Sequence, residues 1–225
     1  MHRVYDEIAE SWYGLRHWTR FRQELDEAVG RWKGGRLLNV GCAHGPDFLP
    51  FAGRFELFGV DFSRCMVEFA RKYGRKHGFE ANLLAGDAGS LPFATGSFDY
   101  AVSVAVYHNI TGRGSRKKAF AELRRVLKPG GEAFLTVWNR WQPGFWFAGK
   151  EVMLPLRTKN GTVKRYYYLY SRREFIRDLE QAGLRVLAAF PERSYVFPLP
   201  WFSRNICVLV EKPHATIEVG EGGGK

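Results

Sequence analysis

Small and acidic residues follow three apolar segments of the sequence. The turn Gly41-Cys42-Ala43-His44-Gly45 follows the first segment, Asp61 follows the second, and Gly86-Asp87-Ala88 follows the third. Small residues let backbone amides approach a ligand closely, and a carboxylate accepts hydrogen bonds from sugar hydroxyl groups. Together these residues predict a site that holds a nucleoside by its sugar and base. Taken singly, either aspartate is equally well interpreted as the cap of a helix or turn.

Alternating strands and helices are needed to bring these residues together. Strands are expected near 36–40, 56–60, 81–84, 98–107, 132–138, 184–190 and 205–211, and helices at 64–77, 115–127 and 172–182. This alternation predicts an α/β fold with a parallel sheet and helices on both faces. In such sheets, ligands bind beyond the carboxyl ends of the strands.

The sequence also suggests how the single domain is organised. Residues 1–33 are expected to form helices laid over the sheet edge, as a cap above the ligand site. Residues 34–213 form the core, within which 139–164 is expected to be irregular and 139–170 to act as a substrate lid. The tail at 214–225 ends in VGEGGGK and is expected to be disordered. Pro50 predicts a short or kinked helix after the first turn.

Composition limits the function classes. The 225 residues suit one domain, and the net charge of +11 favours a polyanionic partner or an acidic surface. Cys42, Cys65 and Cys207 are far apart, so the sequence predicts neither a disulfide framework nor a metal site. No stretch reaches the roughly 18 apolar residues of a membrane span. A cytoplasmic protein in a reducing compartment is therefore expected, with no membrane partner.

Four segments together resemble a known family. NVGCAHG, GVDFS, AGDAGSLPFATGSFD and LKPGG are similar to the motifs of class I S-adenosylmethionine (SAM) dependent methyltransferases. The resemblance implies a Rossmann-like, seven-stranded sheet whose last strand is antiparallel, with SAM as cofactor, S-adenosylhomocysteine as product and no metal. Asn39 and Ala43 depart from the family, which usually has an acid and a glycine there. A dinucleotide site is the weaker reading because the G-x-G-x-x-G spacing is absent.

The same resemblance implies cofactor contacts. The first turn would lie against the methionine part of SAM, Asp61 would bind the ribose, and Asp87 with Ala88 would meet the adenine. The full set of implied cofactor-binding residues is Tyr5, Trp12, Arg16, Gly41, Cys42, Ala43, Gly45, Asp61, Phe62, Met66, Asp87, Ala88 and Val104.

Segments outside these motifs suggest a subfamily. Four segments are similar to tRNA methyltransferases that esterify 5-carboxymethyluridine at the wobble position: VYDEIAESWYGLR, SVAVYHNI, Leu127 to Trp138 with Gln142, and RYYYLY. The resemblance implies tRNA as substrate and a small zinc-binding activator protein as partner. This chain departs from the subfamily at His108-Asn109, where two histidines are usual, and at 111–116, where a more highly charged run is usual.

An ester-forming reaction has modest chemical requirements. A carboxylate is ionised at neutral pH and attacks without a general base, so the site mainly needs groups that orient it. Arg16, Arg113 and Arg165 are the candidate cations, and His108 and Tyr166 the candidate neutral donors. Each arginine has the alternative interpretation of a solvated surface charge. For an amine or carbon acceptor, His108 would be the base.

Aromatic residues interleaved with cations also favour nucleic acid. The segments at 138–141, 145–147 and 164–168 are suited to stacking bases while arginines contact phosphates; packing over the active site is the alternative for 145–147. Two rival functions remain open: a small-molecule methyltransferase acting on a quinone precursor or another metabolite, and an inactive RNA- or partner-binding module on the same fold.

A docking place for the activator is expected at the third strand. That strand would lie at a sheet edge, where Asn82, Leu83, Leu84 and Ala85 present unpaired backbone groups beside apolar side chains. Nothing charged is expected to guard this edge. Self-association along this edge is the alternative. Leu83→Lys tests the prediction if Leu83 points outward.

Overall fold

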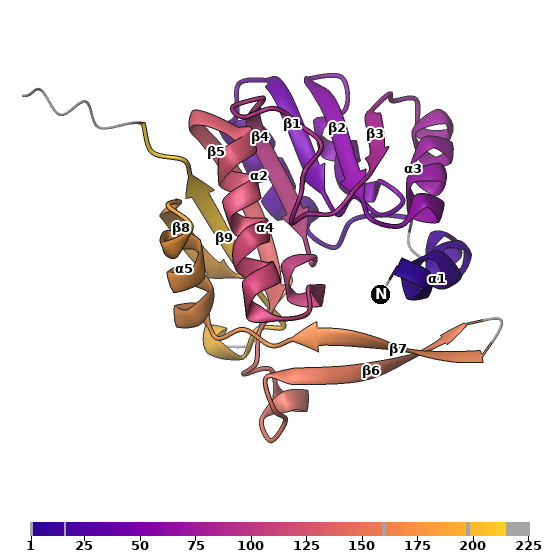
Figure 1. Cartoon of the computed structure of the whole chain (residues 1–225), viewed down its shortest axis with the longest axis vertical. Helices are drawn as coiled ribbons and strands as arrows, with labels where there is room; N and C mark the ends of the chain where they lie inside the picture. Colours follow the sequence, from indigo (N-terminus) through magenta and orange to yellow (C-terminus); the bar gives the residue numbers. More distant parts are fainter. Residues whose placement is uncertain (1, 16, 159–160, 197–198, 215–225) are drawn as a thin grey trace, which may run out of the picture.

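The computed structural model describes residues 2–15, 17–158, 161–196 and 199–214. Seven strands form one sheet in the order β3-β2-β1-β4-β5-β9-β8 (Figure 1). β9 runs antiparallel to both of its neighbours, and the other six strands are parallel to one another. The strands are β1 (Gly35–Val40), β2 (Phe55–Asp61), β3 (Asn82–Ala85), β4 (Phe98–Val104), β5 (Leu127–Trp138), β8 (Arg185–Pro191) and β9 (Asn205–Glu211). The predicted fold class and the antiparallel last strand are confirmed.

Helices cover both faces of the sheet, as expected. α4 (Arg113–Val126) and α5 (Arg172–Gln181) bury Phe120 and Phe175 against one face. α2 (Arg22–Arg31), the 3-10 helix η1 (Pro46–Phe51) and α3 (Arg64–His77) pack on the other. α1 (His2–Leu15) contacts α3 and β7 beyond the carboxyl ends of the strands. Among the described residues, no helix is long and apolar enough to cross a membrane.

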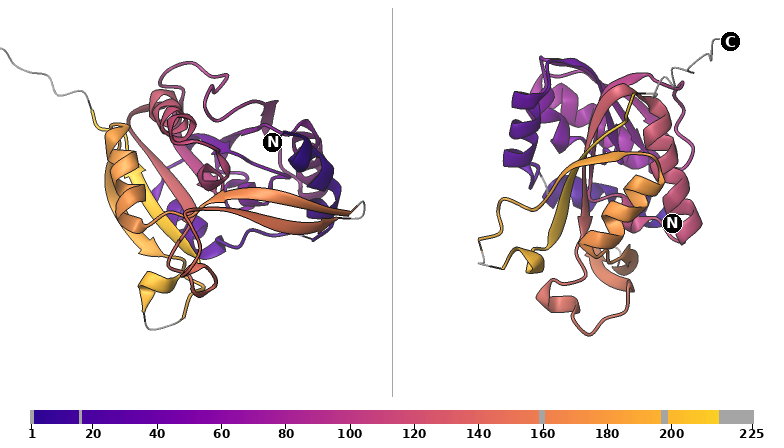
Figure 2. Two further views of the ribbon diagram at one scale, coloured as in Figure 1. Left: turned by 60° about the horizontal axis from the view of Figure 1, so that its bottom comes forward. Right: turned by 90° about the vertical axis from the view of Figure 1, so that its left-hand side faces the viewer.

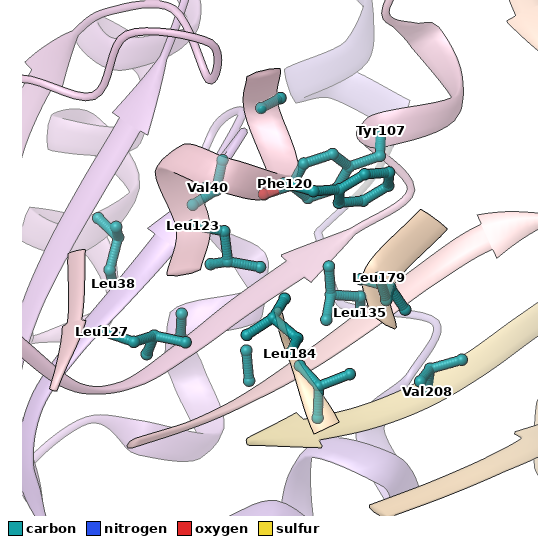
Figure 3. Packing of buried hydrophobic residues seen from close by; sticks show 14 of the residues in the cluster. Leu38, Val40, Tyr107, Phe120, Leu123, Leu127, Leu135, Leu179, Leu184 and Val208 are labelled. Atoms are coloured by element: carbon teal, nitrogen blue, oxygen red, sulfur yellow. The ribbon is translucent and has the colours of Figure 1, made fainter. Parts of the chain in front are cut away.

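The larger core lies between the sheet and α4 and α5 (Figure 3). Tyr107 and Phe120 stack there at 4.5 Å between ring centroids, and both are fully buried. Burying a large side chain of this kind contributes about 1.5–3 kcal/mol. The packing fixes the end of β4 and the turn after it, which carries His108.

Local signals explain several element boundaries. The Ser63 hydroxyl accepts from the Met66 amide and the Ser171 hydroxyl from the Glu174 amide, so both serines cap helices as predicted. Gly78 adopts the left-handed conformation that ends α3. Pro50 lies inside the 3-10 helix η1. The helix after the first turn is short, as expected, because proline lacks the amide hydrogen that a longer helix needs.

The expectation of an irregular segment at 139–164 was wrong. β6 (Glu151–Thr158) and β7 (Gly161–Tyr168) form an antiparallel hairpin that extends across the carboxyl ends of the sheet strands (Figure 1). Its alternating exposed and half-buried residues have the period of a strand. The dipeptide Asn160-Gly161, typical of tight hairpin turns, was the available signal.

Two other expectations need correction. β4 ends at Val104 rather than at Tyr107, because the chain turns through Ala105 (φ 60°) into the 3-10 helix η2 (Tyr107–Asn109). Within the first 33 residues, α2 does not lie over a sheet edge: it packs on a sheet face, where Trp32 stacks on Tyr100 at 4.7 Å. The predicted tail at 214–225 falls almost entirely outside the described residues.

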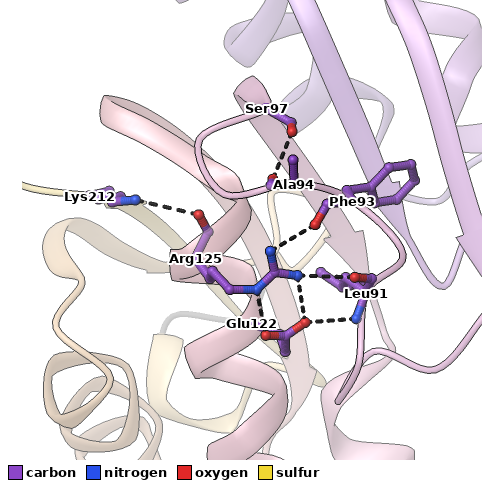
Figure 4. A network of polar contacts seen from close by, with 7 residues as sticks. All are labelled: Leu91, Phe93, Ala94, Ser97, Glu122, Arg125 and Lys212. Atoms are coloured by element: carbon purple, nitrogen blue, oxygen red, sulfur yellow. Dashed lines mark hydrogen bonds and ion pairs between the residues drawn. The ribbon is translucent and has the colours of Figure 1, made fainter.

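The loop after β3 is tied to α4 by an arginine. Arg125 donates to the carbonyls of Phe93 and Leu91 and pairs with Glu122, which also accepts from the Leu91 amide (Figure 4). Because these bonds replace water on otherwise free loop carbonyls, they hold the segment that begins with Asp87 close to the sheet.

Candidate active site

A cavity of about 700 Å³ opens at the carboxyl ends of β1, β2 and β4. Its walls come from α1, the first turn, the loops after β3 and β4, and the β6–β7 hairpin. The volume falls within the roughly 300–1,000 Å³ of pockets that enclose small ligands.

The first turn packs closely against the loop after β4. Gly41 has φ 72°, and a Cβ there would lie 2.3 Å from Val106 Cγ2, so only glycine fits. Ala43 also adopts a left-handed conformation, with φ 46°, at the position where the family usually has glycine. This conformation puts strain on alanine but leaves the turn intact.

Asp61 holds this turn together. Its Oδ2 accepts from the Ala43 amide and its Oδ1 from the Ser63 amide, both at 2.9 Å. Each carboxylate oxygen keeps a further lone pair for a ligand in the cavity. Burial raises the pKa of Asp61 to about 6, although the two amide bonds oppose the shift. The carboxylate is therefore mostly ionised at neutral pH and becomes protonated below pH 6.

Most of the predicted cofactor residues gather around Asp61. The cavity lining includes Tyr5, Trp12, Gly41, Ala43, Asp61, Phe62, Met66, Asp87, Ala88 and Val104. Cys42 does not reach the cavity, because its side chain packs in the core beneath the turn. Gly45, with φ 91°, lies behind the turn against Phe48. Arg16 lies outside the described residues.

Asn39, which stands where the family usually has an acid, does not line the cavity. Asn39 is fully buried and is not among the lining residues. Within the described part of the chain, its side-chain amide forms no hydrogen bond. The position at which an acid is usual therefore gives no reason to expect loss of binding.

A residue not anticipated from the sequence joins α1 to the site. Asp6 accepts from the Ser63 hydroxyl at 2.6 Å and from the Cys65 amide at 3.3 Å. On the same helix, Tyr5 packs edge-on against Phe62 at 5.0 Å. The first helix is thereby fastened to the wall that carries Asp61.

The cavity wall also presents a cation between aromatic rings. Arg165 Cζ lies 5.0 Å from the Trp12 ring centroid and 5.2 Å from that of Tyr167. Among the described residues, no carboxylate forms an ion pair with Arg165, and its Nε is buried without a hydrogen-bond partner. The hairpin thus presents a positive charge that an anionic ligand can neutralise.

His108 lies in the same cavity as a neutral donor. Its Nδ1 accepts from the Trp138 amide at 3.1 Å, which leaves the ring proton on Nε2. Burial, followed by the charge of Arg165, lowers the pKa of His108 to about 3. With Nδ1 occupied and so low a pKa, His108 is unsuited to the role of general base. The alternative of a base for an amine or carbon acceptor therefore loses support.

Two predicted substrate residues lie elsewhere. Because side chains alternate along β7, Arg165 and Tyr167 face the cavity while Tyr166 faces the core, where its hydroxyl is 3.3 Å from Arg116 Nη1. Arg113 begins α4 as an exposed residue and does not line the cavity.

Two other lining residues were not named as catalytic or cofactor-binding residues, although Trp138 stands in a segment expected to stack bases. Trp138 stacks on Tyr167 at 4.3 Å, and together they form a flat wall beside His108. Asn109 Nδ2 donates to the Ala105 carbonyl at 2.9 Å, while its Oδ1 has no partner among the described residues. The sequence signal for Trp138 was its place at the end of a strand; Asn109 gave none beyond the resemblance.

The arrangement suits transfer of a group to an anion. Asp61, Asp87, Arg165 and His108 all line the same cavity, so a nucleoside-bearing donor and an anionic acceptor can be held there together. Among the described residues, no three His, Cys, Asp or Glu side chains cluster as metal ligands.

Comparisons with known proteins identify the family. Residues 37–131 match the model of a methyltransferase domain. A protein named as a methyltransferase in Encephalitozoon cuniculi is 31% identical over 206 residues, covering 88% of this chain and 92% of that protein. The tRNA (carboxymethyluridine(34)-5-O)-methyltransferase of Arabidopsis thaliana is 33% identical over 140 residues, covering 61% of this chain but only 32% of that longer protein.

Solved structures share the fold at low sequence identity. A SAM-dependent methyltransferase from Clostridium acetobutylicum superposes with a TM-score of 0.73 at 15% identity, covering 94% of this chain and all of that one. A complex between the Haloferax volcanii Trm112 methyltransferase activator and a methyltransferase matches with a TM-score of 0.62 at 19% identity, covering 93% and 98% of the two chains. The chain belongs to the class I SAM-dependent methyltransferases.

Proposed function

We propose that this methyltransferase esterifies the carboxymethyl group of a modified wobble uridine in tRNA. The observation that carries the proposal is Arg165, a cation with no ion-pair partner among the described residues, beside the neutral donor His108. A carboxylate is the acceptor that this pair suits, because the guanidinium supplies two parallel donors in the geometry of a carboxylate.

The residues around the first turn fit SAM. Asp61 keeps free lone pairs beside the first turn, and Asp87 with Ala88 lines the same cavity. SAM supplies an electrophilic methyl group on a sulfonium. The acceptor carboxylate would take this methyl group, and the cofactor would leave as S-adenosylhomocysteine. No proton moves, so Arg165 and His108 need only orient the acceptor and exclude water.

A nucleic-acid substrate is supported by three further observations. The stacked pair Trp138 and Tyr167 provides a flat wall on which a base can lie. The net charge of +11 favours a polyanion. The carboxymethyluridine methyltransferase of Arabidopsis is among the relatives. In this proposal, α1 acts as a cap over the cofactor and the β6–β7 hairpin as a lid over the substrate. The cytoplasmic location expected from the sequence remains a prediction.

Paired tRNA substrates test the proposal. One tRNA carries carboxymethyluridine at the wobble position, and the other is the same transcript with uridine there. With labelled SAM, we expect methyl transfer to the first and none to the second, because only the first offers a carboxylate. Equal labelling of both would contradict the carboxylate acceptor, and transfer only to small metabolites would support the rival function.

The proposed partner is a Trm112-type activator, in analogy to the haloarchaeal complex. Its proposed docking place is the β3 edge. β3 pairs only with β2 and lies at the edge. Leu83 points inward and is 8% exposed, so Leu83→Lys would disrupt the core instead of testing the contact. Leu84 is 44% exposed and points outward. The expectation that nothing charged guards the edge was also wrong, since Arg71 Nη2 donates to the Leu83 carbonyl at 3.0 Å.

Leu84→Lys therefore replaces the original test. We expect it to weaken the complex with a Trm112-type protein from the same organism at least tenfold, because a charge would be desolvated at the contact. Val196→Lys, at a position 94% exposed far from β3, is the matched control and should leave affinity unchanged. Calorimetric titration measures both, and wild-type affinity in Leu84→Lys would rule out this edge.

A further inference from the structure

Two loops outside the cavity gather exposed aromatic rings. They join β5 to β6 and β8 to β9, and their exposed rings are Trp141, Trp146, Phe147 and Trp201, here called the aromatic platform. Their exposed fractions are 45%, 47%, 102% and 60%, so none is packed as a core residue. None lines the cavity, and packing of 145–147 over the active site is therefore not observed for Trp146 and Phe147.

Polar contacts hold the two loops against each other. Asn139 Nδ2 donates to the carbonyls of Trp201 and Ser203, at 2.7 and 2.9 Å. Trp146 Nε1 donates to the Trp141 carbonyl at 2.7 Å, and its ring lies 5.4 Å from that of Phe202. Exposed rings held in place lose little conformational freedom when a ligand stacks on them.

The charge around the platform is positive. Arg140 Cζ lies 4.9 Å from the Trp141 ring centroid, and Arg172 Cζ lies 5.8 Å from that of Trp201. The sequence contains no Asp or Glu at 133–150 or at 193–210. The second loop begins at Glu192, which is buried and accepts from Asn205 Nδ2 at 2.6 Å. Rings interleaved with arginines, without acids, match the bases and phosphates of a single strand.

The platform is continuous with the cavity. Trp138, which lines the cavity, contacts Phe145 with 6.0 Å between centroids, and Phe145 directly precedes Trp146. Asn205 lines the cavity from the end of the second loop. Both loops project from the sheet on the side of the hairpin (Figure 2). A strand with one nucleotide in the cavity would therefore pass over these rings.

We propose that the aromatic platform stacks the unpaired anticodon-loop nucleotides that flank the methylated uridine. This proposal rests on the proposed function, since it assumes an RNA substrate whose target base enters the cavity. The rings supply sequence-tolerant stacking, and Arg140 and Arg172 contact the phosphates. The single-stranded loop is favoured over a membrane surface because the rings adjoin the cavity and have guanidinium groups over their faces.

Binding of an unmodified anticodon stem-loop tests the platform independently of methyl transfer. Fluorescein-labelled RNA is titrated with the full chain, and anisotropy gives the dissociation constant. We expect Trp141→Ala and Trp201→Ala each to weaken binding about 5- to 150-fold, the range for loss of one stacked base. Trp141→Phe should retain most of the affinity. Met153→Ala is the control and should bind as wild type, because exposed Met153 pairs with Tyr166 and so projects from the hairpin face opposite to Arg165 and Tyr167. SAM affinity should not change in any variant.

The outcomes separate the two proposals. Wild-type RNA affinity in both tryptophan variants would overturn the platform, and the proposed function would stand if the modified tRNA is still methylated. Platform-dependent RNA binding without methylation of the carboxymethyl tRNA would support the platform and contradict the proposed acceptor. Binding of anionic phosphatidylserine vesicles, but not of RNA, would overturn the platform as a nucleic-acid surface.

Discussion

Replacing Arg165 by methionine is expected to lower kcat/KM for tRNA with a wobble carboxymethyluridine by about 30- to 1,000-fold. Loss of one partner from a desolvated, hydrogen-bonded charge pair costs about 2–4 kcal/mol. Methionine keeps much of the contact with Trp12 and Tyr167 but cannot orient a carboxylate. Steady-state methylation with labelled SAM measures the change.

Three comparisons make this prediction specific. Arg165→Lys should lie between wild type and Arg165→Met, because it keeps the charge without the planar fork. Arg157→Met removes an exposed cation from the same hairpin and should have little effect. SAM affinity should be nearly unchanged in all three. If Arg165→Met methylates at the wild-type rate, the acceptor is not held by this cation.

Replacing Asp61 by alanine is expected to weaken SAM binding about ten- to a hundredfold. The loss corresponds to about 1.5–3 kcal/mol for a hydrogen bond to a charged group. The change also leaves the Ala43 and Ser63 amides without an acceptor, so the free energy of unfolding should fall. Calorimetry and thermal unfolding measure the two effects. Wild-type SAM affinity in Asp61→Ala would remove Asp61 from the ribose site.

The raised pKa of Asp61 predicts how both SAM affinity and folding stability change with pH. Below pH 6 the carboxylate gains a proton and loses acceptor capacity, so SAM affinity should fall between pH 7 and 5. Its folded-state pKa lies above the unfolded value, so the folded state binds the proton more tightly. This group's contribution to stability is therefore complete below pH 4 and is lost as the pH rises through 6.

Asp61→Asn cannot titrate at this position and is the control for both trends. Its SAM affinity should change little between pH 7 and 5. Relative to this variant, wild type should become more stable as the pH falls. An identical affinity profile in wild type and Asp61→Asn would assign the pH dependence to other groups.

The sequence indicated the cofactor end of the site better than the substrate end. Asp61 and Asp87 follow adjacent strands, and parallel strands bring their carboxyl ends together whatever the details of packing. Arg165 and Tyr167 depend instead on a hairpin whose register decides which side chains face the cavity. Unless the hairpin is recognised, the sequence gives no reason to prefer Arg165 and Tyr167 over Tyr166 as substrate-binding residues.

Burial was the other property that spacing did not reveal. Leu83 and Leu84 are adjacent and chemically identical, yet only Leu84 is exposed, because alternate residues of a strand face opposite sides. Cys42 belongs to a ligand-binding turn by sequence but packs inward, and Asp6 reaches Ser63 only through the placement of α1. Such contacts follow from tertiary packing, to which no local pattern corresponds.

The chemical stability of the transferred methyl group tests the central claim most directly. After incubation of carboxymethyluridine-containing tRNA with SAM labelled in the methyl group, the tRNA is digested and its nucleosides are analysed by mass spectrometry, with and without mild alkali. Transfer to a carboxylate predicts label in the wobble nucleoside that alkali releases as methanol, since an ester hydrolyses under these conditions. Two results would contradict the account. One is label in the tRNA that survives alkali, and the other is methylated metabolites without any label in the tRNA.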